Sequence, residues 1–283
     1  MTTFEIHLTV KQTDDTSNKA VDLLYQACID DGHELSKQAL KQVMQKGAVW
    51  LTDNGKTQRL RRAKKSLANG QELHLYYNDD ALSDEFEHPI LVKDCGDFSV
   101  WYKPSGMMSQ GSKWGDHSTI ARFAQLTLSP ERPAFLVHRL DRATQGLIVI
   151  AHSKQAVRGL THLFEHRQIT KKYQAVVGGD FNESREYTTD IDERSAYTKV
   201  SLIKSCQNHD RSLVDVEIGS GRKHQIRRHL SDDGFAILGD RLYGSANEST
   251  PYNLQLCAYY LAFECPISGE PQVFSTEPKL LMP

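Results

Sequence analysis

The stretch that most constrains the fold of this chain runs from His138 to Ala151, with the sequence HRLDRATQGLIVIA. It ends in the apolar run Leu147–Ile150, which is bounded by glycine and by polar residues. A short apolar run bounded in this way predicts a buried strand. Just before the strand, the carboxylate of Asp141 lies between two guanidinium groups, those of Arg139 and Arg142. Arginine beside an acid at the mouth of a strand favours the ionised form of that acid.

Local residue types leave two interpretations of Asp141 open. A structural ion pair at a strand end and a functional carboxylate contain the same residues in the same order. The choice between them therefore depends on segments elsewhere in the chain.

Length and composition indicate an ordinary globular protein. The chain has 283 residues, enough for two domains, with 39% hydrophobic and 25% charged residues. No apolar run approaches membrane-spanning length, and the N-terminus lacks the regions of a signal peptide. The 5 cysteines are scattered without a CxxC pair, which predicts a reducing compartment and no zinc or disulfide framework. We therefore expect a cytoplasmic protein.

Basic residues gather in two segments, although the formal net charge is −2. Residues 56–65, KTQRLRRAKK, include six basic residues and no acid, and residues 222–228, RKHQIRR, include four basic residues and a histidine. The stretch between Asn78 and Glu87 is acidic. Two basic segments separated by an acidic linker predict two contacts with nucleic acid. The alternative that each segment is only a solvated face stays open.

The first 78 residues predict a small αβ unit. Alternating apolar residues over 1–12 predict an edge strand, and residues 20–29 have helical spacing. A second helix is expected after Ser36, which is a favourable N-cap. Three further features are expected at the end of this unit: a strand over 48–51, a turn over 53–55 and a strand over 72–77.

This order of elements resembles the S-four domain, a small RNA-binding domain. The resemblance spans Asp14 to Tyr77 and rests on these residues: Leu35, Ser36, Leu40, Gly47, Val49, Asn54, Gly55 and Gly70. It implies that the basic stretch holds an RNA backbone, adding affinity more than sequence choice, through Arg59, Arg61, Arg62, Lys64 and Lys65. A similar αβ unit without an RNA role remains the alternative.

The rest of the chain predicts an α+β fold around a largely antiparallel sheet. Strands are expected over 97–103, 147–150, 171–177, 197–204, 212–218 and 258–263. Helices are expected over 118–126, 153–167 and 223–230. Loops rather than regular crossover helices join most of these strands, which disfavours a doubly wound fold.

One short pattern in the expected helix over 153–167 competes with this interpretation. His162 to His166 has the form H-x-x-E-H, which some zinc peptidases use. No third ligand is evident, and the same helix has an apolar stripe, so we expect both histidines at the surface and no metal.

Five motifs together resemble the RluA-type pseudouridine synthase family. In chain order they are HRLDRATQG (138–146), KKYQAVV (171–177), SGRKHQIRRHL (220–230), ILGDRLYG (237–244) and LCAYYLAFECPISGE (256–270). The resemblance spans Val92 to Leu280. It implies three parts for the chain: an RNA-binding domain over 1–78, an acidic linker over 79–91 and a pseudouridine synthase catalytic domain over 92–283.

The resemblance also implies an activity: isomerisation of uridine to pseudouridine in ribosomal or transfer RNA, without a cofactor or a metal. Asp141 is similar to the catalytic aspartate of the family, Tyr173 to its active-site tyrosine, and Arg227 to the arginine that pairs with the aspartate. Four further residues are expected to bind the substrate: Arg139 and Leu140 beside the aspartate, and Lys279 and Leu280 in a C-terminal ending of the family type. The expected helix over 223–230 turns His224, with Arg227, toward the site or the RNA. We expect a monomer.

Three positions depart from the family pattern. Gln145 stands where the family usually has Ser or Thr, Cys257 stands where His is common, and residues 107–114 differ from the usual sequence. The last departure leaves open which RNA and which uridine are modified.

The residue types suit this chemistry. A carboxylate can act at the sugar as nucleophile or as base, which divides one difficult step into easier ones. Tyr173 offers an aromatic face for uracil and a hydroxyl for proton transfer. The target nucleotide is expected to flip out of its stack.

Two other functions are alternatives to this activity. One is an RNA-binding factor without activity, and the other is an N-glycoside hydrolase, which needs a second acid to activate water. No second acid is evident near the motif around Asp141.

Overall fold

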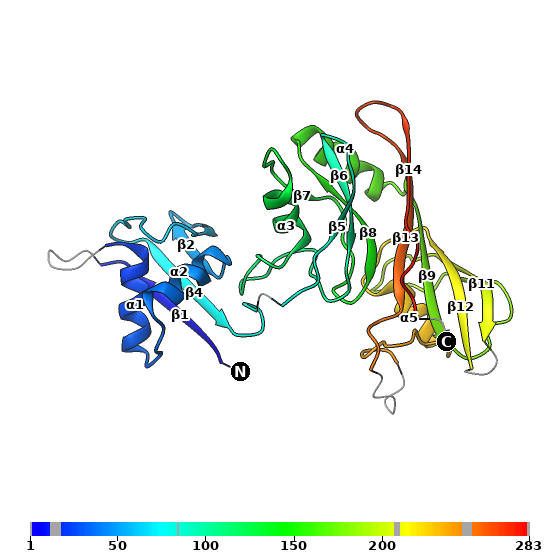
Figure 1. Cartoon of the computed structure of the whole chain (residues 1–283), viewed down its shortest axis with the longest axis horizontal. Helices are drawn as coiled ribbons and strands as arrows, with labels where there is room; N and C mark the ends of the chain where they lie inside the picture. The colour runs from blue at the N-terminus through cyan, green and yellow to red at the C-terminus, as the bar shows by residue number, and fades with distance from the viewer. Residues whose placement is uncertain (1, 12–17, 84, 207–209, 245–250, 282–283) are drawn as a thin grey trace. The chain divides into compact units, whose positions relative to one another are not determined.

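The computed structural model describes residues 2–11, 18–83, 85–206, 210–244 and 251–281 (Figure 1). It divides into two compact units. The first comprises Met1–Phe86 and Gln110–Phe123, and the second comprises Glu87–Ser109 and Ala124–Pro283. The segment Gln110–Phe123 lay inside the range expected for the catalytic domain, but it packs with the first unit.

The first unit has a four-stranded antiparallel sheet in the order β1-β4-β2-β3. Its strands are β1 (Thr3–Thr9), β2 (Val49–Asp53), β3 (Lys56–Arg59) and β4 (Glu72–Asn78). Its two long helices are α1 (Ala20–Asp30) and α2 (Lys37–Gln45). Leu24 from α1, Leu40 from α2 and Leu73 from β4 are fully buried in one core. The expected edge strand over 1–12 is therefore β1, at one end of the sheet.

Local signals explain where these elements begin and end. The Ser36 side chain accepts a hydrogen bond from the Ala39 amide at 3.1 Å, so Ser36 is the N-cap of α2 as predicted. Asn54 and Gly55 both have positive φ, which suits the tight turn between β2 and β3. Strand β3, at the other edge of the sheet, was not predicted, because its sequence KTQR contains no apolar residue.

The second unit is built on a ten-stranded sheet whose main path is β10-β11-β12-β9-β13-β8-β6-β5, with β14 beside β13 and β7 beside β8. The pairing of β13 with β8 is parallel and the other pairings are antiparallel. The first five strands are β5 (Ile90–Asp94), β6 (Phe98–Lys103), β7 (Phe135–Leu136), β8 (Gln145–Ala151) and β9 (Thr170–Gly178). The remaining five are β10 (Arg185–Tyr187), β11 (Thr198–Cys206), β12 (Arg211–Ile218), β13 (Leu256–Glu264) and β14 (Pro271–Ser275).

Three helices follow the first unit's helices in the chain: α3 (Ile120–Thr127), α4 (Lys154–Glu165) and α5 (Gln225–Asp232). Leu160 from α4 lies in one core with residues of β6 and β8. Leu230 from α5 lies in a second core with residues of β9 and β12. Ser153 accepts from the Ala156 amide at 3.1 Å and is the N-cap of α4, as predicted. Among the residues that the structure describes, no helix is long and apolar enough to cross a membrane.

The α+β prediction with a largely antiparallel sheet is confirmed. The strands that were not predicted in this unit are β5, β7, β10 and β14. All five residues of β5 are exposed, and the strand begins inside the expected acidic linker. Such edge or short strands lack the alternating apolar pattern on which strand prediction depends.

Strand β8 is the buried strand that the run Leu147–Ile150 predicted, and these four residues have no exposed surface. It lies between β6 and β13. Gly146 has φ +118°, and a Cβ atom there would lie 2.2 Å from the Ala258 carbonyl oxygen of β13. Glycine at position 146, just after the loop that bears Asp141, therefore allows β13 to approach β8 closely in the parallel pairing.

Candidate active site

The loop that bears Asp141 connects β7 to β8 and is tied to the unit by hydrogen bonds. His138 accepts through Nε2 from the Val149 amide of β8 at 2.9 Å. Burial, with the nearby Lys171, lowers the pKa of His138 to about 3, so the ring is neutral and can accept. Further along the loop, the buried Ser109 hydroxyl accepts a hydrogen bond from the Leu140 amide at 3.1 Å and donates one to the Leu140 carbonyl at 2.7 Å.

Lys103 lies buried beneath the same loop. Its Nζ donates to the carbonyl oxygens of Pro104 and Met107, both at 2.9 Å, and approaches that of Arg142 at 3.4 Å. Burial lowers the pKa of Lys103 to about 7, while the negative charge of Asp141 opposes that shift. Through these hydrogen bonds, the Lys103 side chain connects the end of β6 to the Asp141 loop.

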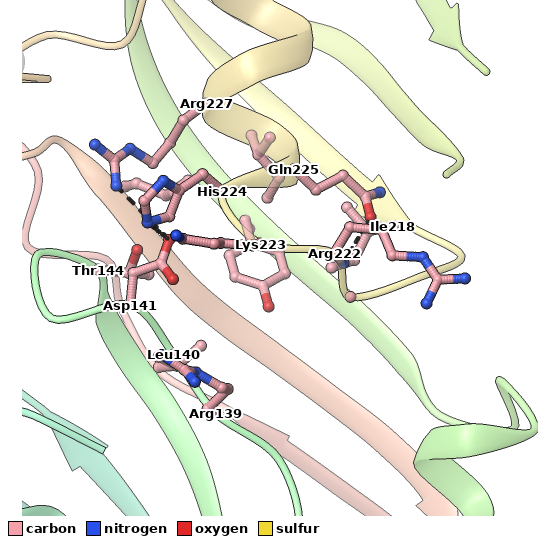
Figure 2. A pocket seen from close by; sticks show the side chains of 14 residues that line it. Arg139, Leu140, Asp141, Thr144, Ile218, Arg222, Lys223, His224, Gln225 and Arg227 are labelled. Carbon is pink, nitrogen blue, oxygen red and sulfur yellow. Dashed lines mark hydrogen bonds and ion pairs between the residues drawn. The ribbon is translucent and has the colours of Figure 1, made fainter. Parts of the chain in front are cut away.

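Two side chains from around the start of α5 face the carboxylate of Asp141, as Figure 2 shows. Arg227 Nη1 lies 3.7 Å from Asp141 Oδ2, and His224 Nε2 lies 3.8 Å from the same oxygen. In the described part of the chain, neither Arg139 nor Arg142, the arginines near Asp141 in sequence, forms an ion pair with it. Arg142 instead donates through Nε to a backbone carbonyl at 3.0 Å, and Arg139 is exposed.

Arg227 has a closer partner, Asp240, that the sequence did not indicate. Its Nε and Nη2 atoms each lie 2.7 Å from one carboxylate oxygen of Asp240, and the Asp240 side chain has no exposed surface. The amides of Leu242 and Tyr243 also donate to Asp240, at 2.9 and 3.1 Å. Burial acts to raise the pKa of Asp240, but hydrogen bonds from Arg227 and the two amides outweigh it and lower the pKa. Arg227 is thus held by two atoms, and its third nitrogen faces Asp141.

His224 immediately precedes α5 with a left-handed backbone, φ 55°. Its Nδ1 atom forms a hydrogen bond of 2.9 Å with the Tyr243 hydroxyl. Burial lowers the pKa of His224 below its ordinary value, although the charge of Asp141 opposes this. The imidazole is therefore neutral at neutral pH, which leaves Arg227 as the cation paired with Asp141.

Asp141 borders a cavity of about 340 Å³ that we call the Tyr173 cavity. Strand β9 contributes Tyr173, and the strand pairs with β12 and β13 on its two sides. Burial, together with the charge of Asp141, raises the pKa of Tyr173 above its usual range. Its phenol therefore stays protonated at neutral pH. Further lining residues include Arg139, Leu140, Thr144, Ile218, Lys223 and Leu256.

The structure brings together six of the sequence-predicted residues in the lining of the Tyr173 cavity: Asp141, Tyr173, Arg227, Arg139, His224 and Leu140. Leu140 is buried in the cavity wall. Lys279 lies elsewhere: its carbonyl accepts from Gln145 at 3.1 Å, and its Nζ lies 5.6 Å from the Tyr102 ring centroid. Leu280 follows it in the chain and does not line this cavity.

The predicted RNA contacts of the first unit fall into two groups. Arg59 and Arg61 both pair with Asp116, at 3.2 and 2.6 Å, and Arg59 also stacks over the Trp50 ring at 4.2 Å. These two arginines serve the packing of the first unit. The other three are at least partly exposed and line, with the two arginines, a groove of about 950 Å³: Arg62, Lys64 and Lys65.

The H-x-x-E-H pattern lies on α4. His162 and His166 are exposed, as predicted, with ring centroids 3.9 Å apart. Within the described ranges, no group of three or more histidine, cysteine, aspartate or glutamate side chains is arranged to hold a metal ion.

Comparison with known proteins places the chain in a family. A family model described as RNA pseudouridylate synthase matches residues 97–232. The dual-specificity RNA pseudouridine synthase RluA of Haemophilus influenzae is 31% identical over 195 residues, which covers 62% of this chain and 86% of that protein. An uncharacterized RNA pseudouridine synthase of Aquifex aeolicus is 28% identical over 278 residues and covers 86% of each chain. Ribosomal large subunit pseudouridine synthase D of Zymomonas mobilis is 30% identical over 166 residues, covering 50% of this chain and 52% of that protein.

Two solved human structures share the fold. Human RNA pseudouridylate synthase domain containing 4 superposes with a TM-score of 0.55 at 22% identity, covering 67% of this chain and 88% of that one. Human RNA pseudouridylate synthase domain containing 1 superposes with a TM-score of 0.55 at 23% identity, and the match covers 68% of this chain and 84% of that one.

The fold and these relatives define an isomerase that acts on RNA, an RNA pseudouridine synthase. Within that class, the chain belongs to the RluA-type family. The family match begins at residue 97, so the resemblance of the first 78 residues to the S-four domain remains a prediction.

Proposed function

We propose that this enzyme isomerises specific uridines in structured ribosomal or transfer RNA, with Asp141 as its catalytic carboxylate. One observation carries the proposal. Asp141 borders a cavity of about 340 Å³ in which a guanidinium lies 3.7 Å from its carboxylate and the Tyr173 ring forms part of the wall. A positioned carboxylate, a fixed cation and an aromatic face are the groups that this isomerisation needs.

Asp141 acts on the sugar of the target uridine. The N-glycosidic bond must break, the uracil must turn, and a bond must form from the sugar to carbon 5 of the base, which loses its proton while the released ring nitrogen gains one. The carboxylate serves either as a nucleophile at the sugar or as a base that removes a sugar proton. Arg227 lies beyond ordinary hydrogen-bond length from Asp141. It therefore sets a positive charge beside the carboxylate without a direct hydrogen bond to the oxygen that reacts.

Tyr173 supports the base rather than the sugar. Its raised pKa keeps the hydroxyl protonated, so the phenol acts as a hydrogen-bond or proton donor and not as a base. Its ring supplies a flat apolar surface against which the uracil stacks and turns.

The size of the Tyr173 cavity supports base flipping. A space of about 340 Å³ lies within the size range of small-ligand sites and suits one nucleobase with its sugar. The target uridine must therefore leave its stack to bring its sugar to Asp141.

The first unit adds affinity for the RNA backbone. The exposed side chains of Arg62 and Lys64 along the groove of that unit are available for phosphate. Contacts of this kind position an RNA without selecting its sequence. Ribosomal RNA as a substrate is favoured by the name of the Zymomonas relative, which is a ribosomal large subunit pseudouridine synthase.

The test is pseudouridine mapping of cellular RNA from cells that lack the protein and cells that express it again. We expect one or more pseudouridines to disappear without the protein and to return with the wild-type chain. Asp141→Asn should restore none of them while still binding RNA. The matched control is Asp190→Asn, an exposed aspartate away from the cavity, which should restore all of them.

Three outcomes would contradict the proposal. Full modification by Asp141→Asn would exclude Asp141 as the reacting group. Loss of RNA binding in that variant would indicate that Asp141 has a structural role rather than a catalytic one. Release of free uracil would indicate hydrolysis rather than isomerisation.

A further inference from the structure

A second cavity reaches Asp141 from another side. It has a volume of about 700 Å³ and shares Arg139, Asp141, His224 and Arg227 with the Tyr173 cavity. We call it the Arg241 cavity. Its other lining residues come from the turn after β6, from the loop before β8 and from residues 239–242 and 253–254. Both cavities lie within the second unit.

The Arg241 cavity has an excess of positive charge. Its lining includes four arginines against two aspartates, and one of those aspartates, Asp240, is already bound by Arg227. Arg142 and Arg241 are exposed. Arg142 is held through Nε by the Gly106 carbonyl at 3.0 Å, and Arg241 has no hydrogen bond or ion pair within the described residues. Unpaired guanidinium groups around a concave surface attract phosphate.

The turn that bears Arg241 is rigid. Asp240 accepts from the amides of Leu242 and Tyr243, and the Ser231 hydroxyl donates to the Tyr243 carbonyl at 2.6 Å. Gly239 has φ +77°, and a Cβ atom there would lie 2.4 Å from the Asn253 carbonyl oxygen, so the turn is also packed from below. A guanidinium on such a support loses little freedom when it binds.

An apolar side chain stands beside this arginine. Leu242 is 68% exposed although it is large and hydrophobic. It lines the Arg241 cavity together with Arg241 itself. A phosphate-binding arginine next to an apolar side chain matches a nucleotide, which has a charged phosphate and a base with a flat, apolar face.

We infer that the Arg241 cavity binds the nucleotide adjoining the target uridine, with the phosphate between the two nucleotides against Arg241 and Arg142. This inference rests on the proposed function, because it takes the sugar of the target to lie at Asp141. The phosphates attached to that sugar must then pass beside Asp141. The Tyr173 cavity is occupied by the flipped base, so the chain continues into the other, larger space that opens at the same carboxylate.

The experiment measures binding of a fluorescein-labelled heptanucleotide, AAAUAAA, by anisotropy. Two further probes replace the linkage on the 5′ or the 3′ side of the uridine by an uncharged methylphosphonate. The protein variants are Arg241→Gln and, as the matched control, Arg158→Gln, an exposed arginine of α4 that lines neither cavity.

We expect one of the two neutral linkages to weaken binding by the wild type and by Arg158→Gln about tenfold, the loss of one charged hydrogen-bonded contact. Arg241→Gln should bind the charged probe about tenfold more weakly and should distinguish it from that neutral probe by a smaller factor than the wild type does, because Arg142 remains. Retained circular dichroism establishes that the variant is folded. In tritium-release assays with RNA labelled at uridine carbon 5, Arg241→Gln should raise KM more than it lowers kcat.

Three results would overturn the inference. The first is a wild type that binds the charged and both neutral probes equally, or binds none of them. The second is that the neutral linkage weakens binding by Arg241→Gln by the same factor as it weakens binding by the wild type. The third is an equal loss in Arg158→Gln. Absence of tritium release by the wild type would instead refute the proposed function, and the binding comparison would still decide the role of the Arg241 cavity.

Discussion

Asp240→Asn tests whether the buried pair with Arg227 holds the site together. The variant keeps the shape of the side chain but removes its charge. Asp240 has no exposed side-chain surface and Arg227 has 6%, so water cannot replace the lost interaction. Among the described residues, Arg227 would then keep one ion pair, with Asp141 at 3.7 Å, and its contact with the Tyr243 ring at 5.1 Å.

The expected loss of stability is large. Removing one partner of a buried ion pair leaves an uncompensated charge and costs about 3–5 kcal/mol. Asparagine can still accept from the two backbone amides, so we expect about 3 kcal/mol, at the lower end of that range. Equilibrium unfolding in urea, followed by circular dichroism at pH 7, measures it. The matched control is Asp192→Asn, which breaks the exposed pair with Arg228 at 2.9 Å and should leave unfolding unchanged.

The pH dependence has a defined sign. The pKa of Asp240 is lowered in the folded protein, so its stabilising effect is present above the pKa of the unfolded chain. The effect is lost as pH falls through the lowered pKa, and the wild type and Asp240→Asn should then converge in strong acid. A loss below about 1 kcal/mol at pH 7, the range of exposed ion pairs, would refute the view that Asp240 anchors Arg227.

Two further predictions concern Lys103 and Tyr173. Because Lys103 has a pKa of about 7 when folded against 10.5 as its ordinary value, the unfolded chain binds more protons between these limits, and stability should rise with pH there. Lys103→Met should remove this rise, of at most about 1.4 kcal/mol per pH unit, in urea titrations at successive pH values; an identical slope in both proteins would show that the buried amine does not titrate there. Tyr173→Phe should lower kcat about a hundredfold with little change in KM, because it keeps the ring and loses the donor, whereas Tyr173→Leu should also weaken binding. The wild-type kcat should show no alkaline decline from Tyr173 between pH 7 and 9, since its pKa is raised; a fully active Tyr173→Phe would exclude the hydroxyl from the reaction.

Local sequence signals predicted the elements whose causes are local. The run before Ala151 is apolar because β8 is covered on both faces, and Ser36 and Ser153 stand where helix amides need acceptors. Strands β5, β7, β10 and β14 were missed because edge or very short strands need no regular apolar pattern.

The candidate site was predictable in part. The motif resemblance indicated Asp141, Tyr173 and Arg227, which the fold brings around one cavity. The Asp240 partner was missed because an aspartate in a loop gives no periodic signal, and its contact with Arg227 depends on how the chain folds back after α5. The pairing of Arg59 and Arg61 with Asp116 was missed for the same reason.

The two separate chain segments that form the first unit have a consequence for protein engineering. Because Gln110–Phe123 belongs to that unit, the unit is discontinuous along the chain. A cut after Phe86 would remove Arg59 and Arg61 and leave Asp116 behind on the remaining polypeptide without either of its cations. This unit therefore cannot be exchanged between relatives as a single N-terminal cassette. A chimaera that preserves its packing must transplant both pieces together.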